Sequence, residues 1–118
     1  MPIPLTASLI VIQFNPVFQV PIELVGSHNF ATWKVQISML MHGDNLFGHL
    51  DGTSPAPSQT VTQDNQQIVN PEYNIWFRQD QLIQNAIMAT IDLTIAPTLT
   101  AATTSKIAWD SLHTAYAK

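Results

Sequence analysis

The stretch from Asn70 to Ile91, N-P-E-Y-N-I-W-F-R-Q-D-Q-L-I-Q-N-A-I-M-A-T-I, decides the fold. Asn70 is a favourable N-cap, Pro71 fits the first helical position, and Glu72 suits the positive end of the helix dipole. The pattern therefore predicts one long helix that ends near Ile91. Its apolar residues fall on two sides of the helix, which indicates a central helix with neighbours on both sides.

Two further helices are expected to pack against this one. The first begins near Asn29, where Ser27 or Asn29 serves as the cap, and ends at Gly43. The second begins after a capping residue within 103–105, and a short helical turn is expected at 44–50. We expect the three helices to share one core that includes all three tryptophans. The core candidates are Phe30, Trp33, Ile37, Leu40, Tyr73, Trp76, Asp80, Ile83, Ile87, Trp109, Leu112 and Tyr116.

Two segments outside the helices complete the expected organisation. Residues 1–25 form an extended N-terminal arm, with two β-branched runs around Asn15-Pro16 that read as short strands or a hairpin. Such a ribbon needs support, so the arm lies on its own domain, lies on a neighbouring copy, or is disordered. Residues 26–118 form the helical domain, with a long polar loop at about 51–70. The predicted class is a small all-α bundle with a β-hairpin-like arm.

Composition excludes several classes of protein. The chain has 118 residues, of which 46% are apolar and only 10% are charged, so it is not a charged disordered tail. Its net charge is −4, which supplies no basic field for nucleic acid. It has no cysteine, which removes disulfides and thiolate metal sites. Without a long apolar run or a basic leader, we expect a cytoplasmic protein that does not enter a membrane.

The sequence gives little support for catalysis or metal binding. A Ser-His-Asp set needs a nucleophile on a strained turn, yet no G-x-S-x-G motif occurs and the four histidines are scattered. The histidines and aspartates at 42–51 match no metal-ligand spacing. We therefore expect no enzyme activity, no cofactor and no metal.

Asp80 is the most informative single residue, because it falls on the apolar side of its helix. A buried charge is costly unless it is paired or hydrogen-bonded. One interpretation is a catalytic acid with a perturbed pKa. The other, which we favour, is a structural acceptor for an indole N–H, for a helix N-terminus or for a cation such as Lys34.

Several apolar side chains are candidates for contacts with other molecules. Val35 and Met39 point away from the core side of their helix and are either isolated surface residues or part of a contact patch. The arm supplies further candidates. These are Leu9, Val11, Phe14, Phe18 and Val20.

Four blocks of sequence follow one another in a specific order. They are L-V-G-S-H-N-F-A-T-W-K-V-Q-I at 24–37, L-F-G-H-L-D-G at 46–52, N-P-E-Y-N-I-W-F-R-Q-D-Q-L-I at 70–83 and A-T-T-S-K-I-A-W-D-S-L-H-T-A-Y-A at 102–117. Together they resemble the N-terminal Gag region of plant Copia-type retrotransposon polyproteins. The resemblance covers residues 20–118.

This resemblance implies a capsid-type protein that assembles with copies of itself into virus-like particles around the element's RNA. The fold it implies is that of retroviral capsid N-terminal domains, which often begin with a β-hairpin. The zinc knuckle of such polyproteins is missing here, so we expect no direct nucleic-acid binding. The chain is then a fragment, a truncated element product or a host-adopted gene. The alternative function is a domesticated host module that binds another protein.

Overall fold

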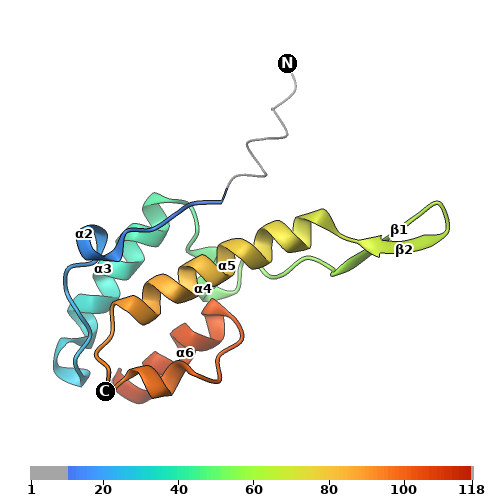
Figure 1. The fold of residues 1–118 in the computed structure, drawn as a ribbon. Coiled ribbons are helices and arrows are strands. Elements are labelled where there is room, and N and C mark those ends of the chain that lie inside the picture. Colours follow the sequence, from blue (N-terminus) through green and yellow to red (C-terminus); the bar gives the residue numbers. More distant parts are fainter. Residues whose placement is uncertain (1–10, 118) are drawn as a thin grey trace.

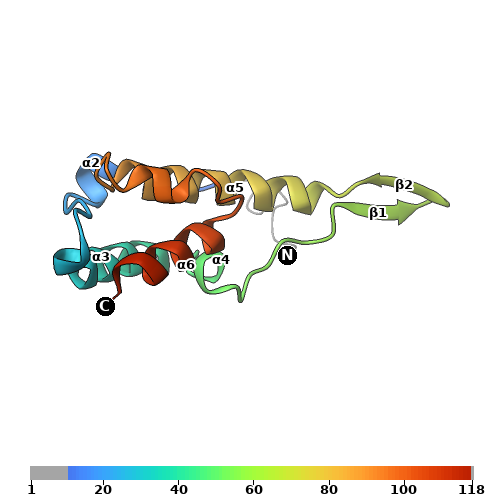
Figure 2. The ribbon, with the colours of Figure 1, turned by 90° about the horizontal axis from the view of Figure 1, so that it is seen from below.

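The computed structural model of the chain describes residues 11–117, which are mostly helical (Figure 1). In chain order the elements are α2 (Pro16–Gln19), the 3-10 turn η1 (Ser27–Asn29), α3 (Phe30–Gly43), α4 (Gly48–Asp51), β1 (Thr60–Gln63), β2 (Gln66–Val69), α5 (Pro71–Ala89), the 3-10 turn η2 (Ala96–Leu99) and α6 (Ser105–Tyr116). Figures 1 and 2 show a helical body and a β1–β2 ribbon that projects beyond the first turn of α5. The helical part of the expected all-α class is confirmed, but the structure also contains a two-stranded sheet, so the chain is mostly helical rather than all-α.

Helix α5 begins where its sequence predicts. The Asn70 side chain accepts a hydrogen bond from the Glu72 N–H at 3.1 Å, and Pro71 occupies the first helical position. The helix ends at Ala89, two residues earlier than expected. The backbone turns at Thr90, whose N–H donates to the carbonyl three residues back at 3.0 Å. This early stop frees the following residues to pair with the N-terminal arm.

Helix α3 runs from Phe30 to Gly43, in agreement with the sequence prediction. Asn29 precedes it, but its side chain does not cap the helix. Instead, Asn29 Oδ1 accepts from the Val25 N–H at 3.1 Å, and Nδ2 donates to the Glu23 carbonyl at 2.8 Å. Asn29 therefore ties the arm to the start of α3.

The core lies where α3, α5 and α6 meet. The rings of Trp33 and Trp109 are 5.7 Å apart, and Trp33 Nε1 donates to Thr90 Oγ1 at 3.1 Å. That bond satisfies a buried indole N–H, which is otherwise costly. The expected core residues that are buried are Phe30, Trp33, Ile37, Asp80, Ile83, Ile87, Trp109 and Leu112, and Leu40 and Tyr116 are partly buried against them.

Tyr73 and Trp76 lie outside this core, so the expectation of three tryptophans in one interior is wrong. Both side chains are only partly buried. The N-terminal half of α5 extends past α3 and α6 toward the ribbon, and those helices do not cover it (Figure 2). Trp76 packs on α4 instead, where its ring stacks on His49 at 5.0 Å. Helical spacing predicts the apolar side of α5, but the ends of its neighbours decide how much of it is buried.

The N-terminal arm is not a hairpin within the described residues. Pro16 starts the helical turn α2, and the Asn15 N–H donates to the Gln19 side chain at 2.7 Å, which stabilises that turn. Farther along, the Leu24 N–H donates to the Thr90 carbonyl at 2.8 Å, and the Leu24 carbonyl accepts from the Asp92 N–H at 2.9 Å. Residues 11–25 therefore pack against their own domain. The first ten residues, including the start of the expected strand, lie outside the described part.

The segment 51–70, expected as a polar loop, contains a β-hairpin. Strands β1 and β2 pair antiparallel, with Thr60 opposite Val69. Asp64 and Asn65 form the turn with φ angles of 52° and 63°. Two central residues with positive φ make the turn whose twist matches that of the strands. The sequence signal is the Asp-Asn pair between two short runs that contain β-branched residues.

Candidate functional site

Asp80 is the centre of a buried polar junction between α4, α5 and α6. Its side chain is 1% exposed. Oδ1 lies 3.0 Å from His49 Nδ1, and Oδ2 accepts from the Ser105 backbone N–H at 3.0 Å. The Ser105 hydroxyl donates to the Asp80 carbonyl at 2.8 Å. Because Ser105 is the first residue of α6, the carboxylate meets the positive end of that helix, one of the acceptor roles expected from the sequence.

His49 connects this junction to the N-terminal half of α5. Its ring is 7% exposed and stacks on Trp76 with an interplanar angle of 16°. Trp76 Nε1 in turn donates to the Ser54 carbonyl at 2.8 Å. The contacts form a continuous chain from the loop after α4, through α5, to the first turn of α6. This chain accounts for a charged residue on the apolar side of α5.

The junction does not place a nucleophile next to a base. Nucleophilic catalysis requires a hydroxyl within hydrogen-bond reach of an imidazole or another base. The Ser105 hydroxyl instead donates to a main-chain carbonyl, and both carboxylate oxygens of Asp80 already have partners. Asp80 thus links the first residue of α6 to His49 of α4.

Within residues 11–117, no three His, Asp or Glu side chains gather in a way that suits a metal ion. His42, in the cluster at 42–51, stacks on Phe47 at 4.1 Å. In the same part of the chain, no helix has the length and apolar character that a bilayer crossing requires.

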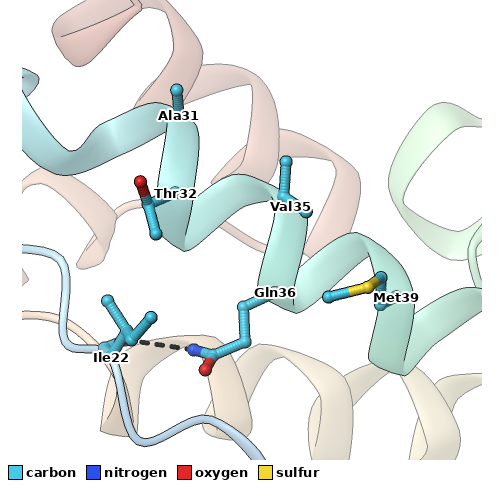
Figure 3. Close-up of a pocket in the computed structure, with 6 residues that line it drawn as sticks. All are labelled: Ile22, Ala31, Thr32, Val35, Gln36 and Met39. Carbon is cyan, nitrogen blue, oxygen red and sulfur yellow. Dashed lines mark hydrogen bonds between the residues drawn. The ribbon is translucent and has the colours of Figure 1, made fainter.

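An apolar surface covers the outward face of α3, and we call it the α3 surface. Six residues line a shallow depression of about 420 Å³ (Figure 3). Val35 and Met39 are 55% and 63% exposed, and Ile22 of the arm is 38% exposed. The six lining residues are Ile22, Ala31, Thr32, Val35, Gln36 and Met39.

The α3 surface is built from two segments that are held together. Ala31, Val35 and Met39 recur every four residues, so they form one stripe along the helix. Gln36 Nε2 donates to the Ile22 carbonyl at 3.3 Å, which fixes the arm beside this stripe (Figure 3). The buried residues of α3 occupy the opposite side of the helix. Val35 and Met39 thus belong to a continuous surface, and Ile22 joins it through the path of the arm, which spacing alone does not predict.

The arm candidates do not form one surface. Val20 is 4% exposed and belongs to the core, which contradicts its expected role as an exposed contact residue. Phe14 packs against that core and is partly buried, as is Val11. Phe18 on α2 is 80% exposed. Leu9 lies outside the described residues.

Two carboxyl groups at chain turns have lowered pKa values. The Thr53 hydroxyl donates to Asp51 at 2.7 Å, and this bond is the main cause that lowers the pKa of Asp51 below the ordinary value of 3.8. The hydroxyl of Thr94 likewise lowers the pKa of Asp92. These bonds stabilise the turns that follow α4 and α5.

The chain shares sequence with known transposon proteins. Over 91 residues, or 77% of this chain, it is 40% identical to the retrovirus-related Pol polyprotein from transposon RE2 of Arabidopsis thaliana. It is 37% identical over the same length to the polyprotein from transposon RE1 of that plant. The chain is homologous to a segment of plant retrotransposon polyproteins. This finding supports the Copia-type origin expected from the four sequence blocks.

The chain spans 6% of the length of each polyprotein, so the match concerns a small segment of a much longer protein. No family model matches the chain, and no solved structure matches it.

Proposed function

We propose that this chain is a non-enzymatic structural domain from the Gag region of a Copia-type retrotransposon and that it associates with copies of itself. The main observation behind the proposal is the α3 surface, an exposed apolar stripe on a helix whose opposite side packs into the core. The homology to transposon polyproteins supplies the context. A capsid-like role requires this combination of a closed core and exposed contact surfaces.

The chemistry of the α3 surface favours a second copy as its occupant. The six lining residues carry no charge, so two such surfaces meet without burying an unpaired ion. Only 10% of the chain is charged, which keeps repulsion between closely packed copies low. The same low charge argues against direct contact with nucleic acid, and we place the assembly in the cytoplasm, as expected from the sequence.

The non-enzymatic part of the proposal rests on the polar junction. Asp80 and His49 are the pair that would serve acid–base chemistry, and their contacts are explained by connecting three helices. The side chains are 1% and 7% exposed, so a substrate would have to displace packed structure to reach them.

Sedimentation velocity across a concentration series tests the proposal. The wild-type chain is expected to show a rising average mass up to high micromolar concentration. The variant Val35→Lys with Met39→Lys is expected to stay monomeric, because it places two charges in the apolar stripe. The control is Leu93→Lys with Ile107→Lys, which adds the same two charges at exposed apolar positions outside the α3 surface.

The control is expected to associate like the wild type. A wild-type chain that remains monomeric throughout the series, or equal association by both double variants, would contradict the proposed role of the α3 surface. Strict monomers that bind one host protein at a fixed ratio would favour the host-adopted interaction module instead.

A further inference from the structure

The β1–β2 ribbon is a second candidate contact surface, besides the α3 surface, and it does not pack against the helical body. It projects from the helical body beside the first turn of α5 (Figures 1 and 2). Seven of its eight strand residues are exposed, and Ile68 alone is partly buried. An isolated two-stranded ribbon is only marginally stable in water, and three or more strands are usually needed. The ribbon is therefore a structure that gains from an additional strand.

The outer edge of β2 is the edge open to such a strand. In an antiparallel pair, hydrogen-bonded and non-hydrogen-bonded positions alternate. The Asn70 N–H donates to the Gln59 carbonyl at 2.9 Å, so the alternation places the backbone groups of Gln67 and Val69 on the outward edge of β2. On β1, the Ser58 hydroxyl donates to the Thr60 carbonyl at 2.9 Å and partly occupies that edge.

The β2 edge also lacks the usual protection against strand pairing. Natural proteins protect open edges with lysine, proline, inward charges or bulges. β2 reads Q-Q-I-V and has none of these, and its pairing with β1 is regular. The only charge in the hairpin is Asp64, which sits in the turn.

We propose that β2 pairs antiparallel with β2 of a second copy and joins two ribbons into one four-stranded sheet. Hydrogen bonding requires outward-facing residues to meet. The antiparallel register that uses both outward residues of each strand places Gln67 opposite the partner's Val69 and Ile68 opposite the partner's Ile68. Val61 is already the cross-strand neighbour of Ile68. The pairing therefore lines up four apolar side chains on one face of the sheet, two from each copy.

The charge of Asp64 determines the orientation of this contact, and the small area of the strands determines its strength. Antiparallel pairing puts the two Asp64 turns at opposite ends of the sheet, whereas parallel pairing would put them together. Four-residue strands bury far less than the roughly 1,200–2,000 Å² of stable interfaces. The contact is weak on its own and becomes effective when the α3 surface or neighbouring copies hold the chains together. In that sense the inference rests on the proposed self-association.

Single-cysteine cross-linking tests the register directly, because the natural chain has no cysteine. In Ile68→Cys, the two sulfurs belong to a non-hydrogen-bonded pair with Cα atoms about 4.5 Å apart, within disulfide range. In the control Val61→Cys, the two sites lie three strand spacings apart, or about 14 Å, beyond that range. Both positions face the same side of the ribbon.

Under mild oxidation at high micromolar concentration, Ile68→Cys is expected to form disulfide-linked dimers about tenfold faster than Val61→Cys. Equal rates, no dimer from either variant, or faster linkage through Val61→Cys, which would indicate pairing through β1, would overturn the proposal. Repeating the reaction with Val35→Lys and Met39→Lys added separates the two surfaces. If linkage through Ile68→Cys persists in this background and the sedimentation matches that of the wild type, the α3 surface is rejected as a contact surface. The ribbon contact is then still supported.

Discussion

The two halves of α5 both carry apolar side chains but have different surroundings. In the C-terminal half, Ile83, Ala86 and Ile87 are buried under α3, α6 and the arm. In the N-terminal half, Tyr73 and Trp76 are partly covered and Phe77 is 41% exposed. The halves meet at Asp80, which holds the start of α6. Apolar spacing therefore predicts which side of a helix faces the core. The positions at which the neighbouring helices end determine how much of that side is buried.

The largest expected effect is in the C-terminal half. Ile87→Ala is expected to lower the free energy of unfolding by about 2–5 kcal/mol, because it removes fully buried methyl groups and leaves a cavity. Phe77→Ala in the exposed half is expected to cost less than about 1 kcal/mol. Urea unfolding of both variants measures the difference. Equal losses would mean that the two halves are covered alike.

The junction between the halves is expected to give the next largest effect. Asp80→Asn cannot accept from both His49 and the Ser105 N–H, and we expect a loss of about 2–3 kcal/mol. The matched control is Asp110→Asn, which changes an exposed pair with Lys106 and is expected to cost about 0.5 kcal/mol or less. Chemical unfolding compares them, and similar losses would contradict the structural importance of the buried junction.

Trp76 in the N-terminal half is expected to contribute less than a core tryptophan. Trp76→Ala removes the stack on His49 and the bond to the Ser54 carbonyl, for an expected loss of about 1–2 kcal/mol. Trp76→Phe keeps an aromatic ring over His49 and is expected to lose about half as much. A loss above about 3 kcal/mol in urea unfolding would place Trp76 in the core after all.

The smallest effect concerns the turns that follow α4 and α5. The folded pKa values of Asp51 and Asp92 lie below the ordinary 3.8, so their contribution is present above that pH and is lost as the pH falls through the folded values. Thr53→Val and Thr94→Val remove the hydroxyl donors and are expected to raise the corresponding pKa toward 3.8. NMR titration of each carboxyl checks this, and unchanged pKa values would contradict the assigned cause.

The sequence predicts the elements that depend on local chemistry. The Asn70-Pro71-Glu72 start of α5, the limits of α3 and the buried acceptor role of Asp80 follow from capping rules and from the cost of burying a charge. Val35 and Met39 are likewise placed outward by helical spacing. These features need no knowledge of distant contacts.

The features that the sequence does not predict depend on where distant segments meet. Val20 is buried because Leu24 pairs with the backbone after α5, a contact that no pattern in the arm indicates. Ile22 joins the α3 surface through the Gln36 side chain. Asp64-Asn65 is a favourable two-residue turn, and this pair indicates a hairpin. The two strands are polar and show no apolar alternation, so their sequences do not predict strands.

Amide NMR spectra across a dilution series test the central claim, association through the α3 surface, most directly. Dilution is expected to shift the amide signals of Ala31, Val35 and Met39 and to leave those around Asp80 unchanged. Smaller shifts at Gln67 and Val69 are expected from the ribbon contact. Signals that do not change with concentration, or changes confined to residues outside the α3 surface, would contradict the account.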